Sequence, residues 1–397
     1  MLDLTPDAAR EAVRLYGGID KAAKAGGYPF HPFRAFCKLH GITAESVATG
    51  PTVVNADPVL QRENRELKAR LRKVTEGEHD AERVVRRLEA AVAQVRPEYA
   101  PSAYKPTKKG RSPQEMVLLF SDLHAAEVVS LEETRGINEY NWDVMLARMD
   151  EIRRSIVSHV DHFGFNISKL HVHMLGDMLS GDIHDELAIT NDRPTAEAVV
   201  QLARDTVEWL ADLRNYFPHI HVAGVVGNHP RFSKKPAAKQ AHNNADWLYY
   251  KLVEAYLSTG DDGFTFSFPR GSFNVQMICD RFRALLMHGD GIRTTMPGVP
   301  WGGIARRITT LEQQFARNRE PLDFVELGHF HSRNANDGIQ AQTFMNGSVK
   351  GPDEYSLKQF GSGHDAKQTL ITVHPKRGWT GQYAIDLQTK LAASEGW

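Results

Sequence analysis

The sequence predicts an α/β protein whose main domain is a four-layer α/β/β/α sandwich, preceded by a small helical domain and a coiled-coil helix. Three observations lead to this prediction. Short helices precede residue 50, a heptad pattern runs unbroken over residues 58–97, and apolar strands alternate with helices from residue 115 onward. We therefore divide the chain into residues 1–50, 58–97, 98–113 and 114–397.

Residues 1–50 are expected to form a helix-turn-helix-like domain. The stretch "PDAAREAVRLYGG" has helical spacing, with a proline at its start and two glycines at its end. A second short helix and a tight glycine turn precede a basic helix at residues 31–40, which carries Arg34 and Lys38. This order is typical of helix-turn-helix proteins, so Arg34 and Lys38 are the expected DNA contacts. The alternative is a small helical bundle that docks to another protein.

Residues 58–97 are expected to form a coiled coil, because apolar residues recur at alternating spacings of four and three. Asn64 falls at an a position, where a buried amide typically fixes the register of a parallel dimer. A homodimer or higher homo-oligomer through this segment is therefore predicted, and a helical hairpin folded at Gly77 is the alternative. Residues 98–113 then form a proline-rich basic linker containing "KPTKKGR".

The main domain begins with strands that alternate with helices. The apolar runs "EMVLLFSD", "KLHVHMLGD" and "HIHVAGVVGN" precede helices predicted near residues 141–162, 195–216 and 240–258, which indicates βαβ units. Strand-rich sequence follows, and the strands beyond residue 332 are expected to complete the second sheet. His171 and His173 alternate with apolar residues along one strand, and we expect them to face helices or solvent.

Composition sets the broad class of the protein. The chain has 397 residues and 41% hydrophobic residues, as in globular proteins. Its net charge of −1 argues neither for nor against a nucleic-acid partner. It has no apolar run of membrane-spanning length and no signal-peptide pattern, so no membrane association is expected. Two distant cysteines, Cys37 and Cys279, predict a reducing cytoplasm, which would be that of a bacterium or a phage-infected bacterial cell.

Five of the apolar runs end in residues that bind metals. Burying such groups without partners costs several kcal/mol each, and shared cations remove that cost. Carboxylate, amide and imidazole together suit a borderline divalent metal, and the absence of thiolates argues against a structural zinc site. The residues are Asp122 and His124, Asp177, Asn228 and His229, His288, and His329 and His331.

The ordered set D-x-H, G-D, G-N-H, H-G and G-H-x-H resembles the calcineurin-like metallophosphoesterase superfamily over residues 115–332. The resemblance implies two divalent metal ions, with Mn expected and Fe, Zn or Ni as alternatives. It implies that His229 faces the scissile phosphate and protonates the leaving oxygen after attack by a metal-activated hydroxide. By the same resemblance, Asp122, His124 and His331 would hold the first metal, Asp177 would bridge, and Asn228, His288 and His329 would hold the second.

The chain departs from the family pattern after the G-N-H motif. Many members have an acidic residue next, whereas this chain has Pro230, which removes the expected support of His229. Pro230 would make the turn rigid, so that Arg231 is free to contact the substrate phosphate. His184 in "SGDIHDEL" is a second candidate substrate contact. A polar loop is the alternative reading of that stretch.

The motifs indicate hydrolysis of a phosphate ester, and the rest of the sequence suggests which substrate carries it. The arginine-containing G-D-x-x-D-R-G pattern of the superfamily's protein phosphatases is absent. The helical domain, coiled coil and basic linker favour hydrolysis of phosphodiester bonds in DNA, and the domain order with "GINEYNWDVMLARMD" resembles metallophosphoesterases of bacteriophage genomes. The alternatives are a small-molecule phosphatase or nucleotide phosphodiesterase, and a non-enzymatic DNA-binding or assembly protein with a vestigial metal site.

Overall fold

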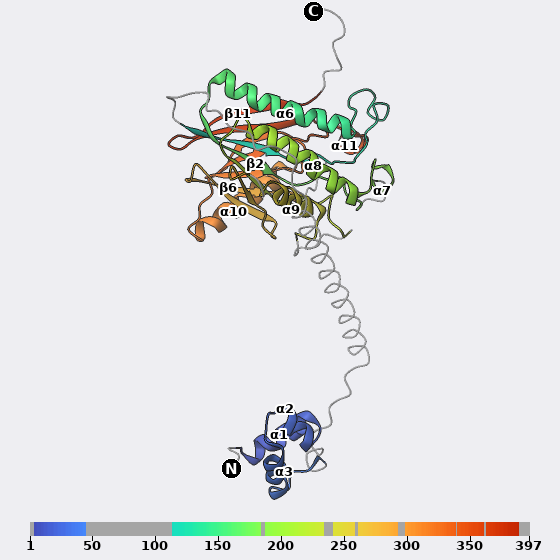
Figure 1. Cartoon of the computed structure of the whole chain (residues 1–397), viewed down its shortest axis with the longest axis vertical. Coiled ribbons are helices and arrows are strands. Elements are labelled where there is room, and N and C mark those ends of the chain that lie inside the picture. The colour runs from blue at the N-terminus through green and yellow to red at the C-terminus, as the bar shows by residue number, and fades with distance from the viewer. Residues whose placement is uncertain are drawn as a thin grey trace, which may run out of the picture. The chain divides into compact units, whose positions relative to one another are not determined.

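The structure is a computed structural model, shown in Figure 1. It describes residues 4–44, 113–183, 187–233, 241–258, 261–292, 298–338, 340–360 and 363–388. These residues fall into two separate units, the helical unit (residues 4–44) and the sandwich unit (the described residues from 113 onward). The predicted coiled coil, the linker up to residue 112 and His184 lie outside the described residues.

The helical unit consists of α1 (Pro6–Tyr16), α2 (Ile19–Ala25) and α3 (Phe30–Leu39). The side chain of Thr5 caps α1 by accepting a hydrogen bond from the Ala8 amide, and Gly17 ends the helix with φ of 69°. Val13, Phe33 and Cys37 form part of its small core. All three predicted helices are therefore present.

The first sheet has six strands in the order β11-β10-β1-β2-β3-β4. The four strands from β1 to β4 are parallel, whereas β10 and β11 are antiparallel to their neighbours. Three long helices connect the parallel strands, as the sequence predicts for βαβ units. The elements are β1 (Gln114–Phe120), α6 (Trp142–Phe163), β2 (Ile167–Met174), α7 (Leu187–Thr190), α8 (Thr195–Arg214), β3 (Ile220–Gly224), α9 (Ala245–Leu257), β4 (Phe264–Ser267), β10 (Lys367–His374) and β11 (Gly378–Asp386).

The second sheet has five strands in the order β5-β6-β7-β9-β8, of which β6, β7 and β9 are parallel. Its elements are β5 (Phe273–Ile278), β6 (Phe282–Met287), α10 (Trp301–Arg317), β7 (Phe324–Leu327), β8 (Asn334–Asp337) and β9 (Gln342–Met345), with α11 (Glu354–Phe360) following. The expectation for the last strands is half right. Strands β8 and β9 complete the second sheet, but β10 and β11 extend the first.

The alternation of side chains along β1 shows how the layers are built. Met116, Leu118 and Phe120 point into a core with α6, α8 and α9, whereas Val117 and Leu119 point into a second core shared with the other sheet. A third core packs α10 against the outer face of the second sheet. The predicted α/β/β/α sandwich is confirmed. Within the described residues, no helix is long and apolar enough to cross a membrane.

The prediction for His171 and His173 is wrong. Both rings are buried on the face of β2 that is turned toward the other sheet, opposite the face that packs on the helices. His173 Nδ1 lies 2.5 Å from Glu326 Oε2 of β7, and His171 Nε2 lies 2.8 Å from Glu115 Oε2 of β1. A buried carboxylate thus pairs with one nitrogen of each imidazole, which the alternating pattern alone assigned to the outside.

Candidate metal centre

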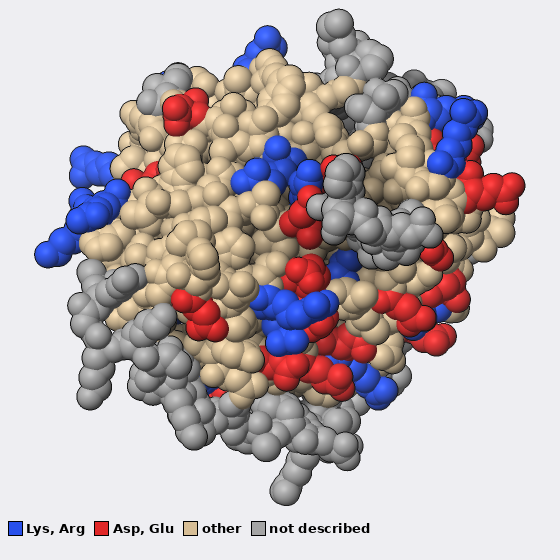
Figure 2. Space-filling model, turned by 90° about the horizontal axis from the view of Figure 1, so that it is seen from above, with Lys and Arg blue, Asp and Glu red and all other residues tan. Residues whose placement is uncertain are grey.

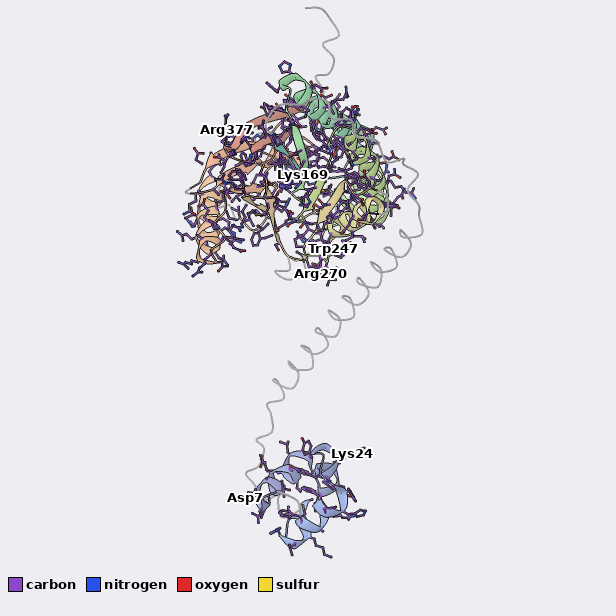
Figure 3. All side chains as sticks on the ribbon, turned by 60° about the vertical axis from the view of Figure 1, so that its left-hand side comes forward. Asp7, Lys24, Lys169, Trp247, Arg270 and Arg377 are labelled. Atoms are coloured by element: carbon purple, nitrogen blue, oxygen red, sulfur yellow. The ribbon has the colours of Figure 1, made fainter. Side chains whose placement is uncertain are left out.

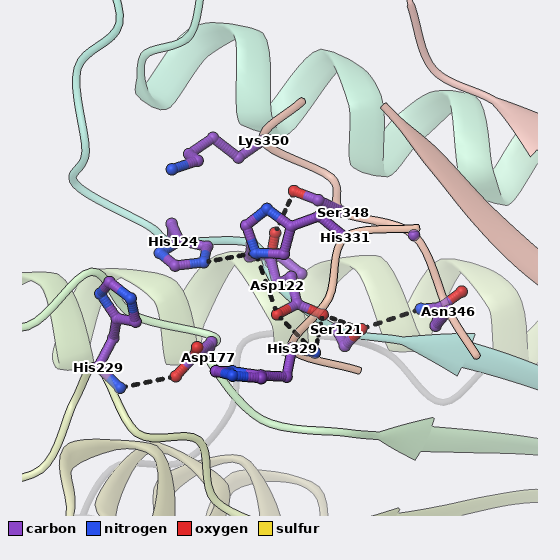
Figure 4. Close-up of polar contacts among 12 residues, drawn as sticks. Ser121, Asp122, His124, Asp177, His229, His329, His331, Asn346, Ser348 and Lys350 are labelled. Atoms are coloured by element: carbon purple, nitrogen blue, oxygen red, sulfur yellow. Dashed lines mark hydrogen bonds and ion pairs between the residues drawn. The ribbon is translucent and has the colours of Figure 1, made fainter. Parts of the chain in front are cut away.

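Polar side chains from five strand ends meet where the two sheets face each other. Figure 4 shows those that follow β1, β2, β3 and β7. His331 Nε2 of the second sheet lies 3.4 Å from Asp122 Oδ1 of the first, and His288 Nε2 lies 3.0 Å from Asp177 Oδ2. Asp122, His124, Asp177 and His288 are buried. The rim is half-buried and consists of Asn228, His229, His329 and His331.

The turns that carry these residues have an unusual backbone. Among the described residues, ten that are not glycine have positive φ, a region in which side chains crowd the backbone. Half of them belong to the predicted metal ligands. These five are Asp122 (φ 54°), His124 (50°), Asp177 (51°), His329 (70°) and His331 (52°). Such strain concentrates at functional sites and persists only where the surroundings hold it.

Glycines allow these turns to approach one another. A Cβ on Gly227 would lie 2.0 Å from Asp177 Oδ1, and a Cβ on Gly328 would lie 2.7 Å from Asp122 Oδ2. Gly176, with φ of 92°, packs just as closely on the backbone of Gly227. In the G-D, G-N-H and G-H-x-H motifs, the close contact between neighbouring turns therefore requires a glycine before the ligand.

The donor atoms form three overlapping groups that suit metal ions. Within each group, the ligand atoms all lie within 4.8 Å of one another. His124 belongs to the first two groups, and Asp177 belongs to the last two, as a shared ligand would. The groups are Asp122, His124 and His331; His124, Asp177 and His229; and Asp177, His288 and His329. Asn228 Oδ1 lies 3.1 Å from His288 Nε2, beside the third group.

Hydrogen bonds orient the imidazole rings for this purpose. His288 Nδ1 donates to the carbonyl of Leu175 at 2.7 Å, which leaves Nε2 to face Asp177 and Asn228. His124 Nδ1 lies 3.3 Å from Glu127 Oε2, and its Nε2 lies 3.3 Å from His331 Nε2. Two ring nitrogens that face each other beside a carboxylate suit a cation between them.

The charges of the site also fit a cation. Burial opposes the ionisation of Asp122 and Asp177, but His331 and His288 hold the pKa of each carboxyl below its usual range. Burial disfavours charge on His288, yet Asp177 raises its pKa to about 10. Burial and His288 together lower the pKa of His329 to about 4, which keeps this ring neutral and able to bind metal. The two buried carboxylates therefore attract positive charge, and a divalent cation would supply it.

The fold can be assigned from these observations. Two facing sheets with outer helices, and five ligand-bearing strand ends in the order D-x-H, G-D, G-N-H, H-G and G-H-x-H, are what the sequence resemblance predicts. The chain has the four-layer α/β/β/α sandwich fold that the resemblance to metallophosphoesterases predicts.

Comparison with known proteins gives limited matches. No protein-family model and no curated protein matches the chain. A predicted phosphoesterase from Streptococcus pneumoniae is 11% identical over 68% of this chain and 98% of its own, with a TM-score of 0.28. An archaeal phosphodiesterase is 10% identical over 68% and 99%, with a TM-score of 0.31. Vps29 from Entamoeba histolytica, solved with zinc, is 13% identical over 68% and 99%, with a TM-score of 0.28. The assignment of the metallophosphoesterase fold is based on the sheets and the ligand-bearing turns, not on these superpositions.

His229 belongs to the second donor group, although the sequence resemblance does not count it among the metal ligands. Its backbone amide donates to Asp177 Oδ1 at 2.8 Å, and its ring packs edge-on against His124 with centroids 4.6 Å apart. Burial lowers the pKa of His229 to about 3, so the ring is neutral at neutral pH. As it stands, the ring is a hydrogen-bonding group, and proton donation to a leaving oxygen stays a prediction.

A sixth segment of the site, residues 346–350 after β9, lies outside the set of metal ligands that the sequence predicts. Asn346 is fully buried and its amide donates to Ser121 Oγ at 3.0 Å, while Ser121 Oγ donates to Asp122 Oδ2 at 2.6 Å. Ser348 Oγ donates to the Asp122 carbonyl at 3.0 Å. The signal was present, because "AQTFMNGSVK" is another apolar strand that ends in polar residues.

Lys350 lies in the same segment, and from the sequence "MNGSVKGPDEYSLKQ" it could contact phosphate, with a solvated helix face as the commoner explanation. The structure shows that it does not lie on a solvated face. Its side chain is only 4% exposed. Its ammonium group donates to Glu127 Oε1 at 2.8 Å and also pairs with Asp353. Because Glu127 also contacts His124, Lys350 is connected to a candidate ligand through one carboxylate. Burial opposes the charge of Lys350, but Glu127 and Asp353 raise its pKa.

The remaining predicted contacts are placed as follows. Arg231 donates from Nη1 to the Asn228 carbonyl at 2.7 Å and from Nε to the Ser233 carbonyl at 2.9 Å, so it bonds to its own loop. His184 lies outside the described residues. Arg34 and Lys38 are exposed on α3 of the helical unit.

Proposed function

We propose that the chain is a metal-dependent phosphoesterase that hydrolyses phosphodiester bonds, and that its substrate is DNA. The observation that supports the first part is the set of three overlapping donor groups that share His124 and Asp177. Two divalent ions bound there, with Mn as our choice, would act as Lewis acids toward a phosphate and lower the pKa of a water molecule. The absence of cysteine from these groups favours catalytic over structural metal binding.

The protein residues have distinct tasks in this proposal. Asp122, His124 and His331 would hold one ion, Asn228, His288 and His329 the other, and Asp177 both. His229 would donate a hydrogen bond to the phosphate, because its backbone is fixed by Asp177 and its ring lies on the half-buried rim.

The helical unit supports DNA as the substrate. Phe33 and Cys37 are buried, so Arg34 and Lys38, one position later in each case, lie on the outer face of α3. A hollow of about 360 Å³ lies on this unit, lined by Ile19, His31, Arg34, Ala35, Lys38, Ile42 and Thr43. On the face of the sandwich unit that Figure 2 shows, basic and acidic side chains are interspersed, so this face offers no continuous basic surface for phosphates.

The test of the activity uses purified protein with Mn²⁺, labelled single- and double-stranded DNA, and bis-p-nitrophenyl phosphate. We expect the wild type to cleave DNA and His229→Ala to lose most of this activity, because acid–base and hydrogen-bonding side chains typically contribute about 10²–10⁴-fold. Turnover of the small ester without DNA cleavage would favour a small-molecule phosphodiesterase. No turnover of either would favour a non-enzymatic role.

The test of DNA binding compares two double variants with equal loss of charge. Arg34→Gln/Lys38→Gln should weaken DNA binding and reduce the dependence of log K on log [salt] by about two, since each phosphate contact contributes about one. Lys21→Gln/Lys24→Gln on α2 is the matched control and should leave the slope nearly unchanged. Equal slopes for the two variants would refute α3 as the DNA-binding surface.

A further inference from the structure

We propose that Asp246 is a positioning residue that fixes the distance between the turn carrying Asp177 and the turn carrying Asn228. Its side chain is fully buried. Oδ1 accepts a hydrogen bond from the amide of Met178 at 3.1 Å, and Oδ2 accepts one from the amide of Gly227 at 2.9 Å. One side-chain carboxyl group thus joins the residue after the shared ligand to the residue before the amide ligand.

The start of α9 strengthens this clamp. Asn244 caps the helix by accepting a hydrogen bond from the Asp246 amide at 2.8 Å, and its Nδ2 donates to the Gly227 carbonyl at 2.8 Å. The amide of Ala245 donates to the Pro230 carbonyl, also at 2.8 Å. Both polar groups of the Gly227 peptide backbone are therefore bonded to side chains from the first turn of α9.

The helix start is itself anchored in the sandwich unit. Trp247, the next residue, is 7% exposed, and the guanidinium of Arg270 lies 5.9 Å from the centre of its ring (Figure 3). Asp246 therefore projects from a fixed support, not from a loop that could follow the metal-binding turns.

This arrangement bears on the position after the G-N-H motif. Pro230 has no side chain that could support the turn by hydrogen bonding, and no amide hydrogen. The acidic group comes instead from Asp246, and it supports the backbone of the turn rather than the ring of His229. Because Asp177 belongs to two of the donor groups, a shift of its turn would disturb both.

The inference rests on the proposed metal site, and Mn²⁺ affinity measured by titration calorimetry tests it on the full chain. In Asp246→Asn, one oxygen can accept from only one of the two amides, while the new NH₂ group faces the other. We expect its Kd for Mn²⁺ to rise about ten-fold or more, the usual effect of losing a group that orients metal ligands. Asn244→Asp keeps the helix cap but cannot donate to Gly227, and its Kd should rise in the same direction.

Asp261→Asn is the matched control. Asp261 is also largely buried, accepts a backbone hydrogen bond from Gly263 at 2.8 Å and pairs with Arg214, but it contacts no metal-binding turn. In the absence of metal, both Asp261→Asn and Asp246→Asn should have a lower melting temperature than the wild type, but Asp261→Asn should keep the wild-type Kd within about two-fold. If the wild type binds Mn²⁺ and both Asp246→Asn and Asn244→Asp match its affinity, the clamp is refuted. If the wild type binds none, the metal site and the clamp fall together. Should Asp246→Asn not fold, Asn244→Asp decides alone.

Discussion

Replacing Lys350 with methionine removes a cation that two buried carboxylates share. The lysine side chain is 4% exposed, and those of Glu127 and Asp353 are 8% and 17% exposed. Methionine fills a similar volume but leaves Glu127 charged and uncompensated, which costs about 3–5 kcal/mol in buried pairs. At about 2–4 °C per kcal/mol for a domain of this size, the melting temperature should fall by roughly 10 °C.

Thermal unfolding followed by circular dichroism, with chelator present and at neutral pH, measures this effect. Lys367→Met is the control, since Lys367 pairs with Asp365 at 3.1 Å but is 33% exposed, and such surface pairs contribute about 0–1 kcal/mol. Adding Glu127→Gln to Lys350→Met should restore part of the loss, because the amide needs no cation. If Lys350→Met and Lys367→Met have the same melting temperature, the buried ion pairs of Lys350 do not stabilise the sandwich unit.

Three further predictions concern pH, packing and metal removal. Burial opposes the ionisation of Glu127 and Asp353, but Lys350 lowers the pKa of both carboxyl groups. Their charged forms therefore stabilise the fold above about pH 4, and this stabilisation is lost as pH falls. In a plot of melting temperature against pH, the decrease at acid pH should be shallower for Lys350→Met than for the wild type. Gly227→Ala places a Cβ 2.0 Å from Asp177 Oδ1, so calorimetry should detect at least about a ten-fold loss of Mn²⁺ affinity, and wild-type affinity would contradict the close packing of the turns. Chelation should lower the melting temperature of the wild type but not of Asp177→Asn, since only the wild type gains stability from bound metal, and equal shifts would argue against Asp177 as a ligand.

The layers and the ligand-bearing strand ends could be predicted because each depends on local sequence. A short apolar run such as "MVLLF" is typical of a buried strand, and a polar residue directly after it is fixed at the sheet edge. Parallel strands have their carboxyl ends at the same edge of a sheet, so the sequence predicts that Asp122 and Asp177 lie close together.

What the sequence could not supply depends on contacts between distant segments. Glu326, the partner of His173, is 153 residues away in the sequence, and Glu127, the partner of Lys350, is 223 residues away. The sequence around His173 or Lys350 does not reveal these partners, so each side chain is expected to be accessible to solvent. The left-handed backbone of Asp122 and His331 is likewise invisible, because neither residue type requires it. The last two strands joined the first sheet because β10 pairs with β1, a choice that local pattern does not encode.

The strained turns explain why so much buried polar structure surrounds the site. Five ligand residues in left-handed conformations, at about 1–3 kcal/mol each, could together cost as much as the whole net stability of a typical domain. Metal binding alone would hold these conformations poorly, because a turn that relaxed in the absence of metal would have to return to the strained conformation each time a metal ion bound. Instead, the backbone of Asp122 is bonded to Ser348, and that of Gly227 to Asp246 and Asn244. The protein therefore fixes the ligand geometry itself, and metal should bind to a folded chain rather than fold it.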